Sequence, residues 1–207
     1  MKKILYLCTL FENRCVTNRY VAMKEDNAID KLVPMLLSPA TRNKAMAELM
    51  RLTKHALYWH IRKMVLVHED ADDVLQNTYI KIWKSIESFK GESQFYTWMY
   101  RIATNEALTF MAQQRMQNVQ VPMDYEDLMI ERMEADAYYD GDAMQTKFQK
   151  AIMTLPEKQR LVFNMRYFED KSYAEIAEIT GTSEGALKAS YHIAAEKITA
   201  YIKNQDD

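Results

Sequence analysis

Apolar residues along this chain recur at intervals of three and four, the spacing that gathers them on one face of an α-helix. The first long run spans residues 42–67 and follows a helix-start signal in which Ser38 or Thr41 is the cap. Acidic residues open a second helix at 68–86, where the helix dipole favours them. A third helix spans 94–114. The first half of the chain therefore reads as three consecutive helices.

The helical pattern is interrupted over residues 115–143, which carry Pro122, Gly141 and a run of acidic residues. Periodicity resumes near Met144, and Pro156 stands at the first position of a further helix, where proline is best tolerated. The pattern predicts a linker followed by a second unit of about four helices. We therefore expect two helical domains that are joined flexibly.

The last two predicted helices form the most specific local pattern in the chain. Ser172 and Glu175 make a capping box, and Gly181 is placed to end that helix in a left-handed conformation. A longer helix begins at Thr182 or Ser183 and carries a buried apolar stripe. This arrangement is typical of a helix-turn-helix, whose second helix lies in the DNA major groove. An ordinary helical hairpin is the alternative.

Composition favours an all-α fold of two small helical domains. Among 207 residues there are 4 Gly and 4 Pro, so tight hairpin turns have few candidates. Hydrophobic residues make up 48% of the chain, which is ample for cores and argues against global disorder. We expect an N-terminal extension, partly disordered and containing the start of the first domain's helices, at 1–37, a first domain at 38–114, a flexible acidic linker at 115–143 and a second domain at 144–205.

Charge is distributed unevenly along the chain. The net charge is −2, but residues 1–112 sum to +4, residues 113–143 to −6 and residues 144–207 to zero. Binding to DNA depends strongly on cationic side chains that neutralise phosphates. A DNA-binding protein with so little positive charge should hold free DNA poorly and would need a larger partner to supply affinity.

The N-terminal segment carries both cysteines, Cys8 and Cys15, which form no CxxC motif or Cys/His cluster. A disulfide scaffold and a zinc site are therefore not expected, and a reducing compartment, the cytoplasm, is the natural context. The apolar start superficially resembles a signal peptide, but no small-residue cleavage site follows it. No apolar run reaches transmembrane length. Met23 is an alternative start of the functional polypeptide, which would make residues 1–22 dispensable.

Acidic residues cluster at the start of the helix at 68–86. Four carboxylates stand within five positions and suggest a metal site: Glu69, Asp70, Asp72 and Asp73. Consecutive positions on a helix point in different directions, however, and the glycine of a calcium-binding loop is absent. We expect no metal there.

Aromatic residues cluster at the start of the next helix, beside the cations Lys90 and Arg101. They are Phe89, Phe95, Tyr96, Trp98 and Tyr100. Flat side chains for stacking and charges for the backbone are what unpaired bases need. Core packing is the alternative, and the spacing favours it for Phe95, Trp98 and Ile102. Phe89 and Tyr96 are better candidates for exposure.

Two long stretches resemble bacterial sigma factors of the sigma-70 family. The first, at about 40–112, is similar to conserved region two through residues 70–76, Tyr79, Trp83, 89–93 and 97–105. The second, at about 144–203, is similar to conserved region four through residues 155–160, 166–169, 172–177 and Lys188. Two such regions joined by a short linker resemble the extracytoplasmic-function (ECF) subfamily. The resemblance implies a factor that binds core RNA polymerase, recognises a promoter and helps to open it, with no catalytic residue, metal or cofactor.

The resemblance also implies roles for individual residues. The clamp helices of the polymerase largest subunit would be contacted by Asp70, Asp72, Asp73, Gln76 and Tyr79. The minus-ten element would be contacted by Phe89, Lys90, Ser93, Phe95, Tyr96, Arg101 and Asn105. Within that set the aromatic residues and Ser93 would cradle a base flipped from the nontemplate strand, Asn105 would hydrogen-bond to it, and the cations would contact phosphates.

The helix-turn-helix would read the minus-thirty-five element. Its candidate residues are Ser172, Ser183, Glu184, Lys188, Ser190, Tyr191 and His192. Ala189 and Ser190 stand where the family commonly has a Ser-Arg pair, so an arginine that could reach guanine or phosphate is missing. Asn77 replaces a usual glutamate in the docking helix, which is a milder departure. The acidic linker resembles those that occupy the polymerase's nucleic-acid channels, and a solvated tether is the alternative.

Two other functions compete with this interpretation. A stand-alone helix-turn-helix regulator would bind duplex DNA without polymerase, but it leaves the docking helix and the aromatic loop without a purpose. An enzyme such as a nuclease would need ligand or triad spacing that the chain does not have. The partners that a sigma factor implies are core RNA polymerase, promoter DNA and an anti-sigma factor, which is often membrane-bound in the family. Insertion of this chain into a membrane is not expected.

Overall fold

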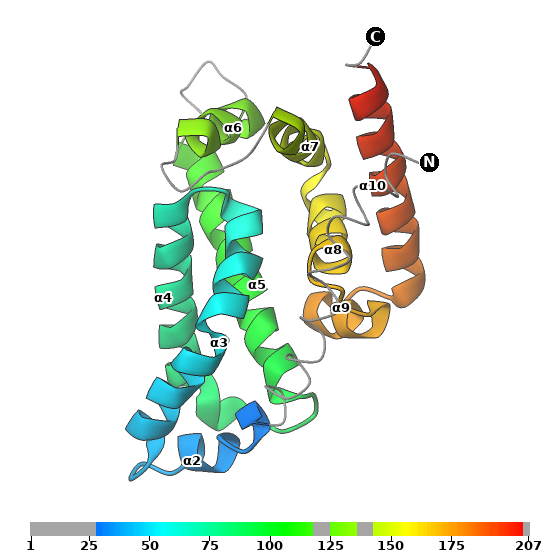
Figure 1. The fold of residues 1–207 in the computed structure, drawn as a ribbon. Coiled ribbons are helices and arrows are strands. Elements are labelled where there is room, and N and C mark those ends of the chain that lie inside the picture. The colour runs from blue at the N-terminus through cyan, green and yellow to red at the C-terminus, as the bar shows by residue number, and fades with distance from the viewer. Residues whose placement is uncertain (1–27, 118–124, 136–142, 205–207) are drawn as a thin grey trace.

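The computed structural model describes residues 28–117, 125–135 and 143–204, and within these ranges every regular element is a helix. Figure 1 shows α2 to α5 on one side of the molecule and α8 to α10 on the other. The all-α fold is confirmed. Of the N-terminal extension predicted at 1–37, only 28–37 is described, and it contains the short helix α2 (Val33–Leu37). The signal-peptide-like start and both cysteines lie outside the described residues.

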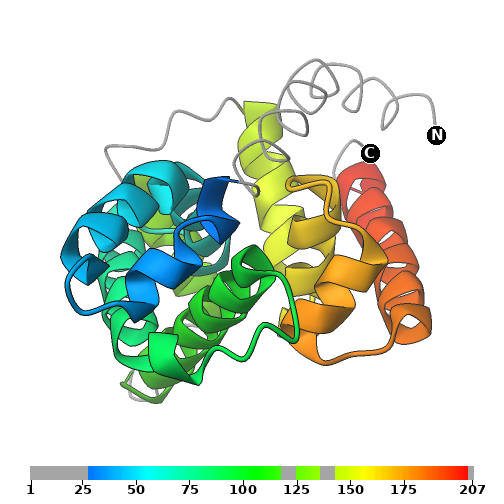
Figure 2. The same ribbon diagram turned by 90° about the horizontal axis from the view of Figure 1, so that it is seen from below.

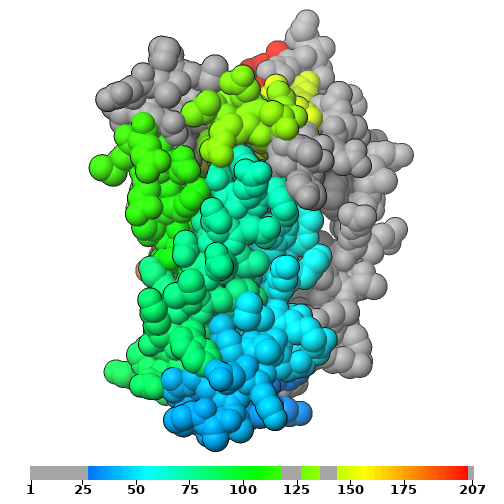
Figure 3. All heavy atoms as spheres, turned by 90° about the vertical axis from the view of Figure 1, so that its left-hand side faces the viewer, coloured from blue at the N-terminus to red at the C-terminus, as the bar shows by residue number. Residues whose placement is uncertain are grey.

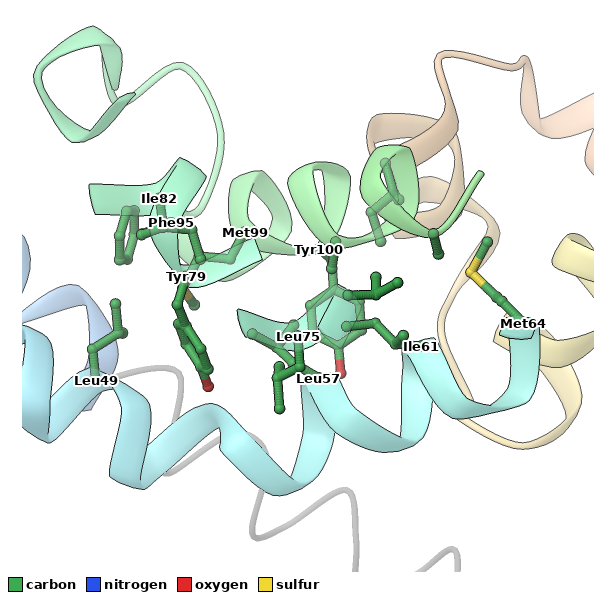
Figure 4. Close-up of a cluster of buried hydrophobic side chains, with 14 of the residues drawn as sticks. Leu49, Leu57, Ile61, Met64, Leu75, Tyr79, Ile82, Phe95, Met99 and Tyr100 are labelled. Atoms are coloured by element: carbon green, nitrogen blue, oxygen red, sulfur yellow. The ribbon is translucent and has the colours of Figure 1, made fainter. Parts of the chain in front are cut away.

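The first domain is a bundle of three long helices, α3 (Arg42–Val65), α4 (His68–Ser85) and α5 (Phe95–Gln117), with a 3-10 turn, η1 (Ile86–Ser88), after α4. Apolar side chains spaced by three and four residues meet between them, as Figure 4 shows. The labelled members of that core are Leu49, Leu57, Ile61, Met64, Leu75, Tyr79, Ile82, Phe95, Met99 and Tyr100. The three predicted helices are confirmed.

The turn between α3 and α4 has an unusual backbone. Leu66 adopts a left-handed conformation with φ of 66°, which is strained for a side chain branched beyond Cβ. Its side chain and that of Val67 are buried against Met129 and Met133 of α6 (Tyr125–Ala135). Apolar burial at roughly 25 cal/mol per Å² can offset a strain of about 1–3 kcal/mol.

Helix α6 falls inside the segment that the sequence predicts as a linker without periodic structure. Its two buried methionines, Met129 and Met133, are four residues apart, which is a helical spacing. Two apolar residues among acidic neighbours are too few to form a visible periodic pattern. Part of the linker is therefore a helix that packs on the first domain. Glu131 and Glu134 of α6 are exposed and lie on its outer side.

The second domain consists of α7 (Ala143–Met153), α8 (Glu157–Tyr167), α9 (Tyr173–Thr180) and α10 (Glu184–Asn204). The predicted capping box is confirmed: the Glu175 amide donates to Ser172 Oγ at 3.2 Å, and the Ser172 amide donates to Glu175 Oε2 at 2.6 Å. Gly181 is left-handed with φ of 69°, as predicted. Pro156 caps α8 from the position before its first residue.

A single apolar core crosses the boundary between the two domains. Ile176 and Ile179 of α9 are buried in the same cluster as Tyr100 and Met111 of α5. Figures 1 and 2 both show α9 beside the N-terminal half of α5, with α10 on the far side of the second domain. The two helical domains were predicted, but nothing in the sequence indicated that they pack on each other.

Candidate nucleic-acid interface

Helix α4 presents an exposed ridge that contains three of the predicted docking residues, Asp72, Asp73 and Gln76. Ile80 and Trp83 continue this face at helical spacing and are 44% and 36% exposed. Figure 3 shows this side of the molecule, where α4 lies between α2 and α6. Carboxylates and an amide next to exposed large apolar side chains make a surface that fits a protein partner better than bulk water.

Asp70 and Tyr79, the other two predicted docking residues, do not lie on the α4 ridge. Asp70 is 8% exposed and its Oδ2 is 3.1 Å from Nη2 of Arg132 on α6. Burial raises the pKa of the Asp70 carboxyl, and the charge of Arg132 opposes that shift only in part. The carboxylate of Asp70, which the sequence predicts to contact polymerase, is therefore paired with Arg132 of α6.

Tyr79 is a core residue with 5% of its surface exposed. Its hydroxyl lies 2.9 Å from Thr53 Oγ1, and because Thr53 already donates to the Leu49 carbonyl, Tyr79 is the donor. Burial raises the pKa of Tyr79 to about 12. Tyr79 therefore lies behind the α4 ridge, where its buried side chain supports the helix.

The loop before α5 carries the aromatic cluster. Phe89 contacts Phe95 and Trp98 with ring centroids 5.0 and 5.4 Å apart, and Phe95 stacks on Trp98 at 5.3 Å. Phe95 is only 1% exposed, so core packing is its role, whereas Phe89 and Ser93 are partly exposed. Lys90 is exposed.

An open cavity of about 880 Å³ lies against this aromatic loop. Phe89, Ser93 and Phe95 line it on one side, and α2 contributes Pro34. Glu175 and Glu178 of α9 complete the lining from the second domain. A hollow with an aromatic floor suits a flipped base, but the four carboxylates of its lining, Asp30, Glu92, Glu175 and Glu178, disfavour the phosphates that come with one.

Two further minus-ten candidates, Arg101 and Tyr96, are engaged by the second domain. The Arg101 guanidinium donates from Nε and Nη2 to the Glu178 carbonyl at 3.1 and 2.6 Å. The ring of Tyr96 lies 4.5 Å from that of Tyr100, and Lys171 Nζ sits over both, at 4.8 and 3.6 Å from their centroids. Both side chains therefore have partners within the chain.

Asn105 lies on the exposed side of α5, well away from the aromatic loop. Ten residues of α-helix separate it from Phe95, which is about 15 Å along the helix axis. The role of Asn105 as a hydrogen-bond partner of the flipped base stays a prediction.

The second helix of the helix-turn-helix, α10, presents Ser183, Glu184, Lys188 and His192 to solvent. Its exposed charges are paired along the helix, with Lys188 Nζ 3.4 Å from Glu184 and His192 Nε2 3.3 Å from Glu196. Such exposed pairs are weak, at roughly 0.3–0.5 kcal/mol, so DNA phosphates can compete for the cations.

The remaining minus-thirty-five candidates are less available. Tyr191 stacks on Phe163 with centroids 5.6 Å apart, which makes it part of the second domain's core surface. Ser172 is held in the capping box, and Ser190 is partly buried. The face that remains open is therefore formed by Lys188 and His192 with small residues between them.

A buried polar cluster between the domains was missed by sequence reasoning. His60 of α3, 1% exposed, lies 2.9 Å from Glu169 Oε1 through Nδ1 and 2.9 Å from Thr104 Oγ1 through Nε2. Lys63 and Lys171 each bring Nζ to 3.9 Å from the Glu169 carboxylate. The one available signal was a histidine on an otherwise apolar helix face.

Glu169 is strongly perturbed by this cluster. Burial alone would raise its pKa, but the charges of His60 and Lys63, the hydrogen bond with His60 and the charge of Lys171 outweigh burial and lower the pKa to about 2. The carboxyl is therefore fully ionised at neutral pH, and it holds cationic groups from α3 opposite the loop between α8 and α9.

Comparison with known proteins agrees with this geometry. Residues 49–116 match the family model for sigma-70 region 2, and residues 145–198 match that for sigma-70 region 4. The ECF RNA polymerase sigma-E factor of Haemophilus influenzae is 32% identical over 144 residues, which cover 62% of this chain and 72% of that protein. The corresponding factor of Escherichia coli is 30% identical over 145 residues, with the same coverage of 62% and 72%. The chain belongs to the ECF subfamily of the sigma-70 family.

Two solved ECF-type structures share the fold. The sigma factor RpoE of Bartonella quintana, solved with the anti-sigma factor NepR, is 23% identical with a TM-score of 0.57, and the match covers 77% of this chain and 98% of that one. CnrH, solved with the cytosolic domain of CnrY, is 17% identical with a TM-score of 0.57 and coverage of 90% and 97%. At these identities the likeness concerns the fold alone.

As an ECF sigma factor, the chain binds core RNA polymerase, recognises promoter elements and promotes DNA opening for transcription initiation. It is not an enzyme, since sigma factors act by binding. Within the described ranges no group of three or more His, Cys, Asp or Glu residues is arranged to hold a metal ion. None of the described helices is long and apolar enough to cross a membrane.

Proposed function

We propose that the α4 ridge is the surface by which this sigma factor docks on core polymerase. The observation that carries the proposal is the exposure, on one helix face, of Asp72, Asp73 and Gln76 together with Ile80 and Trp83. Charged groups set orientation and association rate, while large apolar side chains supply binding energy when they are buried by a partner. Tyr79 supports α4 from the core side. Asp70 becomes available to polymerase only when α6 and its Arg132 move away from it.

The minus-ten element is proposed to bind at the aromatic loop. Phe89 and Ser93 offer a stacking face and a hydroxyl at the cavity of about 880 Å³. Tyr96 lies nearby at the start of α5, and Lys90 supplies a cation for the strand's backbone. Stacking contributes roughly 1–3 kcal/mol per base, which offsets the few kcal/mol needed to flip a base. Asn105, on the exposed side of α5, is proposed to hydrogen-bond to the flipped base.

The minus-thirty-five element is proposed to meet α10 through Ser183, Lys188 and His192. Glu184 sits at the same face and would discriminate by accepting a hydrogen bond from a cytosine amino group. Because Lys188 is the exposed lysine among these candidates, polymerase must provide most of the affinity.

An anti-sigma factor is proposed as a further partner, and the cytoplasm as the site of action. Both fold neighbours were solved with an anti-sigma factor bound. A protein that works on polymerase and promoter DNA acts where they are.

The docking assignment is tested by Asp73→Arg. We expect a loss of at least about tenfold in affinity for core polymerase, because a cation replaces an anion at a charge-complementary contact. Glu48→Arg is the matched control, since Glu48 is a partly exposed acid of α3, paired only with its neighbour Arg51 in the contacts described. Affinity is measured by fluorescence titration with labelled sigma factor, with thermal unfolding to verify the fold. Equal affinity of Asp73→Arg and the control would contradict the α4 assignment.

A further inference from the structure

The polar cluster between the domains joins α3, α5 and the loop after α8 through the His60 ring. Thr104 Oγ1 donates to the Tyr100 carbonyl at 2.7 Å and lies 2.9 Å from His60 Nε2. Glu169 is ionised and can only accept, so His60 Nδ1 donates to its Oε1 at 2.9 Å. This buried hydrogen bond crosses the domain boundary.

The loop that presents Glu169 is itself built rigidly. Asp170 adopts a left-handed backbone with φ of 49°, a conformation that aspartate tolerates better than most residues. Arg166 Nη1 fixes the loop by donating to Asp170 Oδ1 at 3.2 Å and to the Lys171 carbonyl at 3.0 Å. The residues on either side of Asp170 both reach the first domain: Glu169 contacts His60, and Lys171 lies over Tyr100.

The first domain contributes further contacts to this loop and to α8. Lys63 of α3 lies 3.9 Å from the Glu169 carboxylate and 5.2 Å from the centroid of Phe168, and its carbonyl accepts from Asn164 Nδ2 at 3.1 Å. The described groups that face Glu169 are thus the cations of His60, Lys63 and Lys171. One carboxylate holds α3 and its own loop together, and apolar burial of Ile176 and Ile179 surrounds the contact.

This contact closes the second domain over the surface that we assign to the minus-ten element. Arg101 is bound to the C-terminal end of α9, where helix carbonyls concentrate negative charge. Lys171 covers Tyr96, and Glu175 and Glu178 line the cavity beside Phe89. A promoter strand would have to displace all of these groups and would meet carboxylates.

We propose that Glu169, paired with His60 and Lys63, is an intramolecular latch that holds region four against the minus-ten surface of the free sigma factor. The proposal rests on the assignment of that surface under the proposed function. Opening the latch frees Arg101 from the Glu178 carbonyl and uncovers Tyr96, and it requires separation of a buried ion pair as well as apolar surface. The free protein is therefore held away from single-stranded DNA, and polymerase, which must bind the open form, supplies the energy of opening.

Only open molecules bind polymerase, so the apparent affinity for polymerase is the affinity of the open form multiplied by the fraction of molecules that are open. Weakening it should therefore tighten binding to core polymerase, which is the opposite of what a damaged binding surface does. The opposite sign separates failure of the latch from failure of the proposed docking surface, because Asp73→Arg weakens binding.

The latch is tested first on the full-length chain without polymerase or DNA. Donor and acceptor dyes are attached at Lys44→Cys of α3 and Lys203→Cys of α10, both exposed sites, in a background in which Cys8 and Cys15 are serine. In Glu169→Gln the population with low transfer efficiency should rise at least about tenfold, because loss of one partner leaves a buried charge uncompensated. Glu48→Gln is the matched control and should leave the distribution unchanged. An unchanged distribution in Glu169→Gln overturns the latch.

Lys63→Met is the second variant, in case Glu169→Gln does not fold. Lys63 lies at the rim of the cluster with 22% of its side chain exposed, so its replacement is milder. It should shift the distribution in the same direction by about two- to threefold. Hydrogen exchange then distinguishes opening from unfolding: exchange should increase in α9 and at the start of α5, while α8 and α10 keep their protection. Equal loss of protection throughout the second domain overturns the proposal.

The consequence for function is tested with core polymerase. Glu169→Gln or, failing that, Lys63→Met should bind core polymerase about two- to tenfold more tightly than the parent protein by fluorescence titration. An opened distance distribution with unchanged polymerase affinity would overturn the proposal that the latch restrains the free factor, and it would leave the α4 docking surface untouched.

Discussion

The two surfaces that would read the promoter differ in what covers them. The minus-ten surface, at the start of α5, is engaged by the second domain: Arg101 binds the Glu178 carbonyl and Lys171 covers Tyr96. The minus-thirty-five surface, on α10, faces solvent with Lys188 and His192 exposed. The minus-ten surface is rich in aromatic and cationic groups, which bind other protein groups well. The minus-thirty-five surface carries small residues and weak charge pairs.

This contrast gives a physical reason for covering the proposed minus-ten surface and leaving the proposed minus-thirty-five surface open in the free protein. A set of exposed aromatic side chains next to cations binds single strands and other partners indiscriminately unless it is covered. On α10, Lys188 and Lys197 are each paired within the chain, so this helix is expected to bind duplex DNA too weakly to need a cover. In this chain the first helix of the helix-turn-helix, α9, packs on α5 beside the surface that we propose for the minus-ten element, while its second helix stays open.

The largest expected effect comes from the apolar contact between the domains. Ile176→Ala removes a fully buried side chain of α9 and should lower the free energy of unfolding by about 2–5 kcal/mol. Ile193→Ala is the same change on the open side of α10, where the side chain is 41% exposed, and should lower it by less than about 1 kcal/mol. Urea denaturation monitored by circular dichroism measures both. Similar losses in the two variants would mean that α9 is no more tightly covered than α10.

The next effect concerns acid stability. The folded-state pKa of Glu169 is lowered from 4.5 to about 2, so its stabilising contribution is complete above pH 4.5 and is lost as pH falls through 2. The lowered pKa of Glu169 contributes at most about 3 kcal/mol to the free energy of unfolding at neutral pH. The parent protein should therefore be more stable than Glu169→Gln at pH 7, and the difference should shrink between pH 4.5 and 2. Urea midpoints across that range test it, and a difference independent of pH would show that the charge of Glu169 does not matter.

The smallest effect is expected on the open surface. Lys188→Ala should weaken binding of the holoenzyme to promoter duplex by a few-fold and reduce the dependence of log affinity on log salt by about one unit. Stability should stay within about 0.5 kcal/mol, since Lys188 is exposed and paired only along its helix and over Tyr173 in the contacts described. Lys197→Ala, also on α10 but directed to Gln159, is the control. Filter binding at several salt concentrations supplies the measurement, and equal salt slopes for the two variants would remove Lys188 from the interface.

Local structure and family membership could both be predicted from the sequence. The capping box at Ser172 and the left-handed Gly181 depend on contacts within a few residues, so their pattern is complete in the sequence. The apolar periodicity of α3, α4 and α5 depends likewise on nearest neighbours in one helix. Ordered motifs of regions two and four then identified the sigma factor, and the family matches agree.

Predictions about single site residues were less successful because exposure is a tertiary property. Tyr79 and Phe95 belong to motifs that suggest binding, yet both are buried. Helix α6 was taken for a featureless tether because two methionines four residues apart are too few to form a visible pattern.

What the sequence determined by itself is the set of helices, their caps and the order of the two conserved regions, because each of these rests on interactions between residues close in the chain. Only the tertiary structure decided that His60 meets Glu169, residues 109 positions apart, and that α9 closes on α5. A pairing over that separation leaves no periodic trace in either segment, since each partner is one polar residue in an apolar or loop context. The relation between the domains, and with it the cover on the minus-ten surface, therefore became visible only in three dimensions.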